Sequence, residues 1–379
     1  MSSILRFCLL LICLGAAQTG DAFKHPGLNL DADDITFIRA RLKEKAEPWT
    51  SALAALAKRR DEFLARAPQA VATYTWPPHH SQPGPANSLR FDGEVAYGCA
   101  LLFTFADDQP AGAKAVAILD AWSSTLTTIA PEANGNQGHK LSTGYLWPAM
   151  QNTAELLRRP EAKGIWKPDA VARFVDLQRR LVLPVVNDRA TSNNAVRRNN
   201  WNSMLIWCHL STAVFIDDRA EFDKAVARWR EQLPVYVAAD GKGMEFGRDL
   251  WHTQMGYGPL VQSAEIAWKQ DLDLYKEQDH RLLKACEYHI PFIRDAIAKK
   301  PGAPKLGGAD WMGHAEVAYN HFVNRLGMKA PVLEGLVMER RPEPFERMGW
   351  GTLTHGGDRT TWKPGAARPA AAATRPAGR

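Results

Sequence analysis

The chain has 379 residues, and a hydrophobic content of 45% excludes a wholly disordered protein. Lys and Arg number 47 against 41 Asp and Glu, so the net charge is a modest +6, and the basic residues are not gathered into runs. Nucleic acid is therefore not expected as a partner, whereas an acidic ligand or polymer is compatible with this charge.

The first 22 residues have the three parts of a secretory signal peptide. Arg6 is followed by the apolar run 7–17 and then by a short polar segment that ends near Ala22. Cleavage is expected after Ala17 or Ala22, and the apolar run is too short to span a bilayer. The sequence thus predicts a periplasmic or secreted protein with no membrane attachment once residues 1–22 are removed.

Apolar residues recur at helical spacing through most of the remaining chain. Helices are predicted at 31–42, 48–65, 97–105, 113–126, 145–157, 170–183, 201–215, 222–233, 255–269, 280–298 and 315–326. Short polar turns join several consecutive pairs, and no comparable series of alternating strand patterns is present. This pattern favours an all-α fold, in which helical hairpins wrap round one core as an incomplete (α/α) toroid. A small β element is expected near the C-terminus, at 332–338 and 351–354.

Three polar segments interrupt the helical pattern, at 74–90, 134–143 and 239–247. In a toroid such loops can gather at one end of the ring, where a ligand groove would form. The last stretch is mostly Pro, Ala, Gly, Thr and Arg, which cannot bury a core. We therefore predict a single toroid domain over 23–362 and a disordered tail over 363–379.

Three cysteines remain after the signal segment, Cys99, Cys208 and Cys286, each in an apolar context. One disulfide and three buried thiols are equally compatible with these positions, and no paired spacing indicates a zinc site. The adjacent His79 and His80 would point apart and have no carboxylate at ligand spacing. We therefore expect no metal and no other cofactor.

The densest polar cluster lies at 245–258. If a helix begins near Arg248, then His252 lies on the adjoining turn of the same face, with Gln254 and Tyr257 further round. A cation, an imidazole and a phenol gathered there could neutralise a carboxylate, accept a proton and donate one. The same residues could instead form structural ion pairs and core contacts, because structural networks imitate functional ones.

A second polar cluster, at 193–203, contains five asparagines before an apolar helix. Capping explains one or two of them. The remaining amides could bond a substrate carboxyl group and stabilise the charge that develops on it. Trp201 offers a flat face for a sugar ring, or a core side chain.

These clusters resemble the alginate-lyase-domain polysaccharide lyases. The similar segments are Asn199-Asn200-Trp201, 215–226, 248–256, 264–275, 25–28, 118–123, 318–321 and 349–353. They follow one another in the family's order from about residue 25 to about residue 355. The resemblance implies a helical toroid whose groove binds an anionic polysaccharide and cleaves it by β-elimination, without consuming water.

The family's site uses an Asn, an Arg, a His and a Tyr, which fall most naturally on Asn200, Arg248, His252 and Tyr257. The resemblance implies that Asn200 and Arg248 hold the uronate carboxylate and that Tyr257 protonates the leaving oxygen. Either His252 or Tyr257 would then take the C5 proton. As a base, Tyr257 would need Arg248 or a protonated His252 nearby to favour its phenolate.

Two departures from the family pattern affect this assignment. Trp201 stands where many relatives carry His, and the nine-residue spacing from Arg248 to Tyr257 differs from that in some relatives. Tyr97 and Tyr145 are therefore reserve candidates for the catalytic phenol. Substrate contacts are expected from residues on the polar segments and helix starts, and the alternative is that these side chains are only solvated. The residues are His79, His80, Arg90, His139, Lys140, Tyr145, Trp201 and Gln254.

The leading hypothesis is an exported lyase acting on a uronate polymer, with alginate first and glucuronan or another polyuronate next. One alternative is a toroid glycoside hydrolase that uses two opposed carboxylic acids among Asp92, Glu245 and Asp249. The other is a polysaccharide-binding protein without turnover. The sequence leaves the oligomeric state open.

Overall fold

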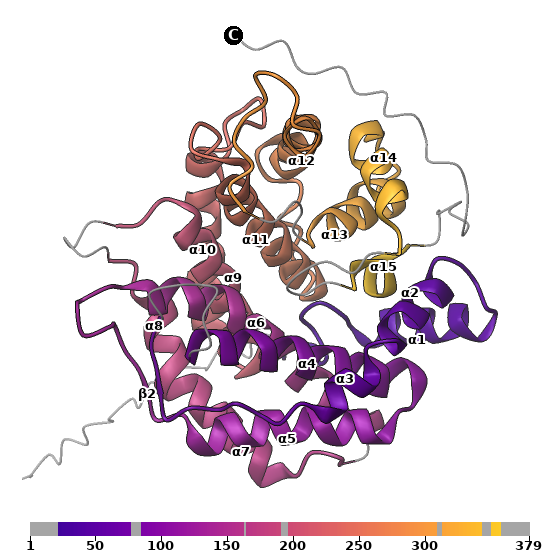
Figure 1. Cartoon of the computed structure of the whole chain (residues 1–379), viewed down its shortest axis with the longest axis vertical. Helices are drawn as coiled ribbons and strands as arrows, with labels where there is room; N and C mark the ends of the chain where they lie inside the picture. Colours follow the sequence, from indigo (N-terminus) through magenta and orange to yellow (C-terminus); the bar gives the residue numbers. More distant parts are fainter. Residues whose placement is uncertain are drawn as a thin grey trace, which may run out of the picture.

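The computed structural model describes residues 22–76, 85–162, 164–190, 196–308, 313–342 and 350–357 (Figure 1). The expected signal peptide up to residue 21, the pair His79 and His80, and the tail from residue 358 lie outside these residues. The helices are α1 (Ala32–Lys43), α2 (Trp49–Ala57), α3 (Arg60–Ala65), α4 (Pro85–Ala106), α5 (Gln109–Thr125), α6 (Gly138–Arg158), η1 (Pro160–Ala162), α7 (Pro168–Leu177), η2 (Gln178–Val182), α8 (Leu183–Asn187), α9 (Asn200–Phe215), α10 (Arg219–Tyr236), α11 (Leu250–Lys269), α12 (Glu277–Ile297), α13 (Ala315–Tyr319), η3 (Asn320–Arg325), α14 (Pro331–Arg340) and α15 (Gly351–His355).

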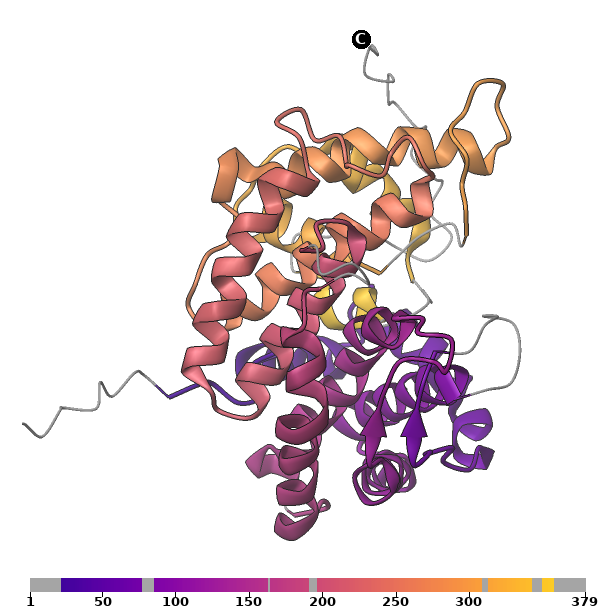
Figure 2. The same ribbon diagram turned by 90° about the vertical axis from the view of Figure 1, so that its left-hand side faces the viewer.

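The long helices α4, α6, α9 and α11 pack side by side in this order. Each is followed in the chain by a second helix, α5, α7, α10 or α12, which returns along the outside of the row. The pair formed by α13 and α14 continues this arrangement, and the last helix α15 packs against α1 and α2. The fold is therefore the expected all-α incomplete toroid, in which the C-terminal helix meets the N-terminal helices (Figures 1 and 2).

Aspartates define where several of these helices begin. Asp31 and Asp34 form a reciprocal capping box at α1, and the side chains of Asp108 and Asp218 accept backbone N–H bonds at the starts of α5 and α10. An N-terminal carboxylate satisfies free N–H groups and interacts favourably with the helix dipole. The short polar turns of the sequence thus contain the aspartates at which the next helix begins.

Aromatic side chains fill the interior between the two layers of helices. Trp122, Trp147, Phe174 and Phe215 form a continuous chain of ring contacts, with centroids 5.5 to 6.3 Å apart. Burying rings of this size contributes most of the apolar area removed from water in such a core. The described part of the chain also buries Cys99, Cys208 and Cys286 as free thiols, so the three-thiol alternative is correct.

The small β element is not where the sequence analysis expected it. Residues 332–338 lie in α14 and 351–354 in α15, whereas the strands β1 (Thr73–Tyr74) and β2 (Thr128–Ile129) pair in parallel in the N-terminal half. The prediction was wrong at 332–338 because Leu333, Leu336 and Val337 are buried at helical spacing. None of the described helices is long and apolar enough to cross a membrane.

Several helices begin earlier than their apolar periodicity indicated. The structure starts α4 at residue 85, α6 at residue 138 and α11 at residue 250, against predicted starts of 97, 145 and 255. The first turns of these helices carry polar residues, which the periodicity of apolar positions does not detect. Two of the expected loop segments, 74–90 and 134–143, are thereby shortened, and Arg90, His139 and Lys140 lie on helices.

Candidate functional site

The inner helices run parallel, so their N-termini lie at one end of the ring. A Cβ built on Gly144 of α6 would lie 2.9 Å from the backbone nitrogen of Leu205 in α9, so only glycine permits this close approach. The Nδ2 of Asn200 lies 3.9 Å from the Sδ of Met255, so the starts of α9 and α11 are also in contact. Helix N-termini carry partial positive charge and unpaired N–H groups, so this end of the ring suits an anionic ligand.

His252 lies in the first turn of α11 and is held by Asp249, the residue that caps this helix. The two carboxylate oxygens of Asp249 lie 2.7 and 2.8 Å from the Nδ1 of His252, and one of them also accepts the backbone N–H of His252 at 2.7 Å. The Nε2 of His252 lies 2.9 Å from an amino group of Arg248. Asp249 is 5% exposed, while a quarter of the His252 side chain reaches solvent.

The contacts of His252 define its protonation pattern. A carboxylate accepts hydrogen bonds and a guanidinium donates them, so Nδ1 carries the hydrogen and Nε2 presents a lone pair to Arg248. Asp249 thus faces Nδ1 and Arg248 faces Nε2, the nitrogen on the more exposed side. This tautomer follows from the partners on either side of the ring.

Glu245 links three parts of the cluster. Its carboxylate accepts the backbone N–H of Asn200 at 3.0 Å, the hydroxyl of Tyr236 at 3.1 Å and an N–H of Arg248 at 3.0 Å. The same Tyr236 hydroxyl lies 2.9 Å from the backbone carbonyl of His252, so its single hydrogen is shared between this carbonyl and Glu245. Burial and the neighbouring Glu245 raise the pKa of Tyr236 well above its ordinary value, so it stays a hydrogen-bond donor.

Asn200 brings a buried amide to the same cluster. Its side chain is fully buried, and its Oδ1 has no hydrogen-bond partner among the described residues. Asn202 is different, because its amide pairs with Gln232 and Arg228 and is therefore structural. Of the five asparagines in the sequence cluster, two lie outside the described residues, and Asn199 and Asn200 each have an Oδ1 without a hydrogen-bond partner among the described residues. Asn200 is the fully buried member of this pair.

Tyr257 makes no hydrogen bond to this cluster among the described residues, although it lies close enough to Tyr236 to contribute to the raised pKa of that phenol. Its ring is fully buried, stacked on His289 at 5.1 Å and edge-on to His314 at 4.7 Å. Burial raises the pKa of Tyr257 well above its ordinary value, and no cation opposes this effect. The condition under which Tyr257 could act as a base, a phenolate favoured by Arg248 or a protonated His252, is therefore not met. The reserve candidate Tyr97 is also buried, with a pKa raised to about 12.

The start of α6 holds two further candidates in a buried setting. The Nζ of Lys140 lies 2.6 Å from the carboxylate of Asp188 and donates to the carbonyl of Ala190 at 3.1 Å. Lys140 is therefore a buried ion-pair partner at the start of a helix, whereas the sequence analysis expected it to contact the substrate. Burial and the adjacent Lys140 lower the pKa of His139 to about 4, so this imidazole is neutral.

The remaining substrate-binding candidates are distributed around the same end of the ring. Trp201 is half-buried and stacks beneath the guanidinium of Arg197, which lies 4.0 Å from the ring centroid. Tyr145 and Gln254 are buried on α6 and α11, and Arg90 lies over the ring of Phe91 on α4. No group of three or more His, Cys, Asp or Glu side chains within the described ranges is arranged to hold a metal ion.

A model of the family described as alginate lyase matches residues 46–298, which is more than half of the chain. The chain belongs to the alginate lyase family. As a family member it is a polysaccharide lyase, and its matched region contains Asn200, Arg248, Asp249 and His252. No curated protein sequence matches the chain.

Solved alginate lyases share the fold at low sequence identity. An alginate lyase from Bacteroides ovatus matches with a TM-score of 0.67 and 16% identity, over 87% of this chain and 99% of that one. Alginate lyase A1-III from Sphingomonas species A1 matches with a TM-score of 0.58 and 16% identity, over 82% and 91% of the two chains. A tyrosine-to-phenylalanine variant of A1-III complexed with a tetrasaccharide matches with a TM-score of 0.66 and 16% identity, over 90% and 98%.

Sequence reasoning identified Asn200, Arg248 and His252 but did not recognise what holds them together. Asp249 was considered as an ion-pair partner or a hydrolase acid, and Glu245 likewise, whereas Tyr236 was not considered at all. One available signal was Asp249 three residues before His252 at a helix start, which is the spacing of a capping side chain. Tyr236 had no local signal, because it reaches the cluster from the end of α10.

Proposed function

We propose that this protein cleaves alginate, or another 1,4-linked polyuronate, by β-elimination. The observation that carries the proposal is the position of His252, which is held between Asp249 and Arg248 at the end of the ring where helix N-termini gather. β-Elimination requires a group that neutralises the uronate carboxylate and a base for the C5 proton. Family membership and the tetrasaccharide bound by a structural neighbour support a polymeric uronate as the substrate.

Arg248 is the group proposed to receive the carboxylate. Half of its side chain is exposed, and one N–H contacts Glu245 while another contacts the Nε2 of His252. A uronate carboxylate can accept two parallel N–H bonds from a guanidinium, which is a stronger interaction than one bond to a neutral imidazole. Arg248 would therefore turn to the substrate while Glu245 retains one of its N–H groups.

This movement of Arg248 uncovers the base. Once the guanidinium leaves, the lone pair on the Nε2 of His252 is available to take the C5 proton. Asp249 keeps the hydrogen on Nδ1 and stabilises the imidazolium that forms. An uncharged sugar would not draw Arg248 away, so the arrangement selects for a free carboxylate.

Negative charge develops on the substrate carboxylate group as the C5 proton is removed. The amide of Asn200 lies beside Met255 at the start of α9, with hydrogen-bonding capacity that the described residues do not use. A preorganised amide and a helix N-terminus stabilise such charge without reorganising during the reaction. Asn200 is accordingly assigned to the carboxylate together with Arg248.

The proton balance closes within the site. The C5–H and C4–O bonds break, a C4=C5 double bond forms, and the leaving oxygen needs one proton. The imidazolium of His252 can return the proton that it took, when C5–H and O4 lie on the same face of the sugar. Tyr257, which the resemblance suggested for this step, packs on another face of α11, so we assign the step to His252.

The hydrolase alternative has less support. A glycoside hydrolase needs two carboxyl groups on opposite sides of the scissile bond, roughly 5 to 9.5 Å apart. Glu245 and Asp249 both contact the guanidinium of Arg248, at 3.0 and 3.7 Å, and therefore flank one side chain. Asp92 is buried and accepts the indole N–H of Trp122 at 2.8 Å, away from both.

The test is the ultraviolet absorbance of the unsaturated uronate during incubation with alginate, glucuronan and hyaluronan. A lyase raises the absorbance, a hydrolase releases reducing ends without raising it, and a binding protein does neither. The His252→Gln variant should lose the activity, whereas the matched His280→Gln variant, on α12 outside the cluster, should keep it. Equal activity in both variants would exclude the proposed base.

Export is proposed from the sequence of residues 1–22. Removal of this segment would leave a chain that begins near Phe23, whose ring packs against Phe222 at 5.3 Å and beneath Arg219. N-terminal sequencing of the protein from the periplasm or the medium tests this proposal. A cytoplasmic protein that retains Met1 would contradict it.

A further inference from the structure

The guanidinium of Arg197 is a cation without a carboxylate partner, three residues before Asn200. It lies 4.0 Å from the ring centroid of Trp201, and its side chain is partly exposed. Partial burial lowers the pKa of Arg197, and the charge of Asp188 offsets this effect only in part. The charge of Arg197 is thus not compensated within the described part of the chain.

The carboxylate of Asp188 is already engaged by other groups. It lies 2.6 Å from the Nζ of Lys140 and accepts the backbone N–H of Ala190 at 3.0 Å. The charges of Asp188 and Lys140 cancel, and the neighbouring His139 is neutral because its pKa is lowered to about 4. Arg197 therefore supplies the surplus positive charge at this place.

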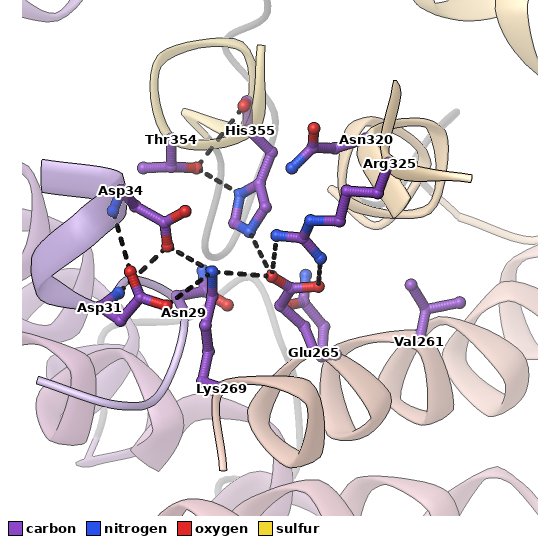
Figure 3. Close-up of polar contacts among 12 residues, drawn as sticks. Asn29, Asp31, Asp34, Val261, Glu265, Lys269, Asn320, Arg325, Thr354 and His355 are labelled. Carbon is purple, nitrogen blue, oxygen red and sulfur yellow. Dashed lines mark hydrogen bonds and ion pairs between the residues drawn. The ribbon is translucent and has the colours of Figure 1, made fainter. Parts of the chain in front are cut away.

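A buried arginine elsewhere in the molecule shows the contrasting arrangement (Figure 3). Two N–H groups of Arg325 donate to the two oxygens of Glu265 at 2.9 and 2.8 Å, and Lys269 lies 3.5 Å from the same carboxylate. Cations that leave water are usually paired in this way, because an unpaired charge costs free energy. A partly buried cation that remains unpaired therefore suits an anionic ligand.

The backbone on both sides of Arg197 is fixed. Its N–H donates to the carbonyl of Arg189 at 2.9 Å. On the other side, the Nε2 of Gln232 donates to the carbonyls of Arg198 and Asn199 at 2.9 and 3.3 Å. Stacking on the indole engages the face of the guanidinium and leaves the N–H groups at its edge for other partners. The cation is thus held in place before a ligand binds, which lowers the entropic cost of binding.

The face of α9 that carries Asn200 and Trp201 is turned to the inside of the ring. The side chains of Asn202 and Ser203 contact Gln232 of the outer helix α10, at 2.7 and 3.2 Å. With 3.6 residues per turn, Asn200 and Trp201 lie on the opposite face of the helix. The indole, with the guanidinium over it, is therefore on the inner side, at the end of the ring where the helix N-termini gather.

Arg197 and Arg248 lie on the two sides of the start of α9. The charge of Arg197 contributes to the lowered pKa of His139, so this guanidinium is on the side of α6. Arg248 is on the side of α11, where Glu245 joins it to the backbone N–H of Asn200. Packed helices are about 8–10 Å apart, so a chain molecule that crosses the start of α9 passes both cations.

We propose that Arg197 binds the carboxylate of a second uronate residue, on the same polysaccharide chain as the residue held by Arg248. A guanidinium can receive a carboxylate through two parallel N–H bonds. Because Arg197 covers a face of the Trp201 ring, the indole supports the cation, and the sugar contacts the guanidinium at that face. This inference rests on the proposed function, since Arg248 defines the residue that is cleaved.

The second carboxylate site makes binding depend on chain length. A short oligomer reaches one cation, whereas a longer one reaches Arg197 and Arg248 together. The second contact is then intramolecular and adds affinity without a second loss of translational freedom. Arg197 does not touch the reacting atoms, so its loss should raise KM for the polymer and leave kcat nearly unchanged.

The experiment is a calorimetric titration of alginate oligomers into the full mature chain that carries His252→Gln, so that the oligomers are not cleaved. Oligomers of two, four and six residues are compared with and without the additional change Arg197→Gln. We expect Arg197→Gln to weaken binding of the hexasaccharide roughly tenfold, the effect of a charge-assisted hydrogen bond. The gain in affinity from the shortest to the longest oligomer should be correspondingly smaller.

Two further variants separate the specific contact from general charge. Arg197→Lys keeps the charge but loses the planar fork, so its affinity for the hexasaccharide should lie between those of Arg197 and Arg197→Gln. The matched control is Arg198→Gln, which removes the same charge from the adjacent, exposed residue. It should change hexasaccharide binding by less than about twofold. Unfolding temperatures show that each variant is folded.

The outcomes distinguish this inference from the lyase function. Equal hexasaccharide affinity with and without Arg197→Gln, or an equal loss for Arg198→Gln, would overturn the second carboxylate site and leave cleavage beside Arg248 intact. If no oligomer binds to the folded chain, both proposals are wrong. If binding depends on Arg197 but the wild-type chain produces no unsaturated uronate, the site stands and only the lyase reaction is excluded.

Discussion

Replacing Asp249 with Asn tests the role of the carboxylate behind His252. Both oxygens of Asp249 lie within 2.8 Å of the Nδ1 of His252, and the side chain is almost completely buried. An Asn amide can present its NH2 group to Nδ1, which favours the tautomer with hydrogen on Nε2 and removes the base. General base catalysis contributes about 10²- to 10⁴-fold, so kcat on alginate should fall by this factor while KM changes little.

The substitution separates catalysis from stability. Asn caps helices about as well as Asp, so the backbone N–H of His252 keeps an acceptor and the fold should be retained. The control is Asp218→Asn, which changes the cap of α10 in the same way without a neighbouring imidazole. The assay combines initial rates from ultraviolet absorbance with ¹⁵N NMR of the His252 ring, which reports the tautomer. Undiminished kcat, or a lost rate with an unchanged tautomer, would refute the reasoning.

Three further predictions concern other charged and titratable groups. Arg248→Lys should raise KM for alginate more than tenfold, measured by initial rates, because an ammonium cannot make the two parallel bonds of a guanidinium; an unchanged KM would contradict its role. Glu265→Gln should lower the free energy of unfolding by about 3 to 5 kcal/mol, measured by denaturant titration, because Arg325 is left without its buried carboxylate partner; a loss below about 1 kcal/mol would contradict it. Burial lowers the pKa of His289 to about 4, so the unfolded chain binds one more proton between about pH 6.5 and 4 and stability is lost as the pH falls through this window. His289→Gln should therefore flatten the decline in unfolding temperature over that range, and an unchanged slope would count against it.

The fold could be predicted from the sequence because it depends on local patterns. Apolar residues at helical spacing mark the buried faces, and capping aspartates such as Asp108 and Asp218 mark the turns between hairpins. The starts of the helices were harder to predict, because the first turns of α6 and α11 carry polar residues that are also typical of loops. The β element was misplaced because a short apolar segment such as 332–338 has the same composition in a helix and in a strand.

The site could be predicted only in part, because its members come from separate elements. Arg248 and His252 are four residues apart at the start of α11, and the sequence pattern was sufficient to pair them. Tyr257 was assigned to the same site from sequence proximity and family resemblance, but five residues turn it to another face of α11, against His289. Lys140 was expected to contact the substrate or to be solvated, and its ion-pair partner Asp188 lies 48 residues away, beyond the reach of local patterns.

The most direct test of the account is the ultraviolet absorbance produced from alginate by the wild-type protein and by His252→Gln, with unfolding temperatures measured for both. The account predicts that the wild type generates unsaturated uronate ends and that the folded variant does so at least about a hundredfold more slowly. Reducing ends without absorbance would contradict the lyase reaction on alginate, and an active, folded His252→Gln variant would contradict the proposed base.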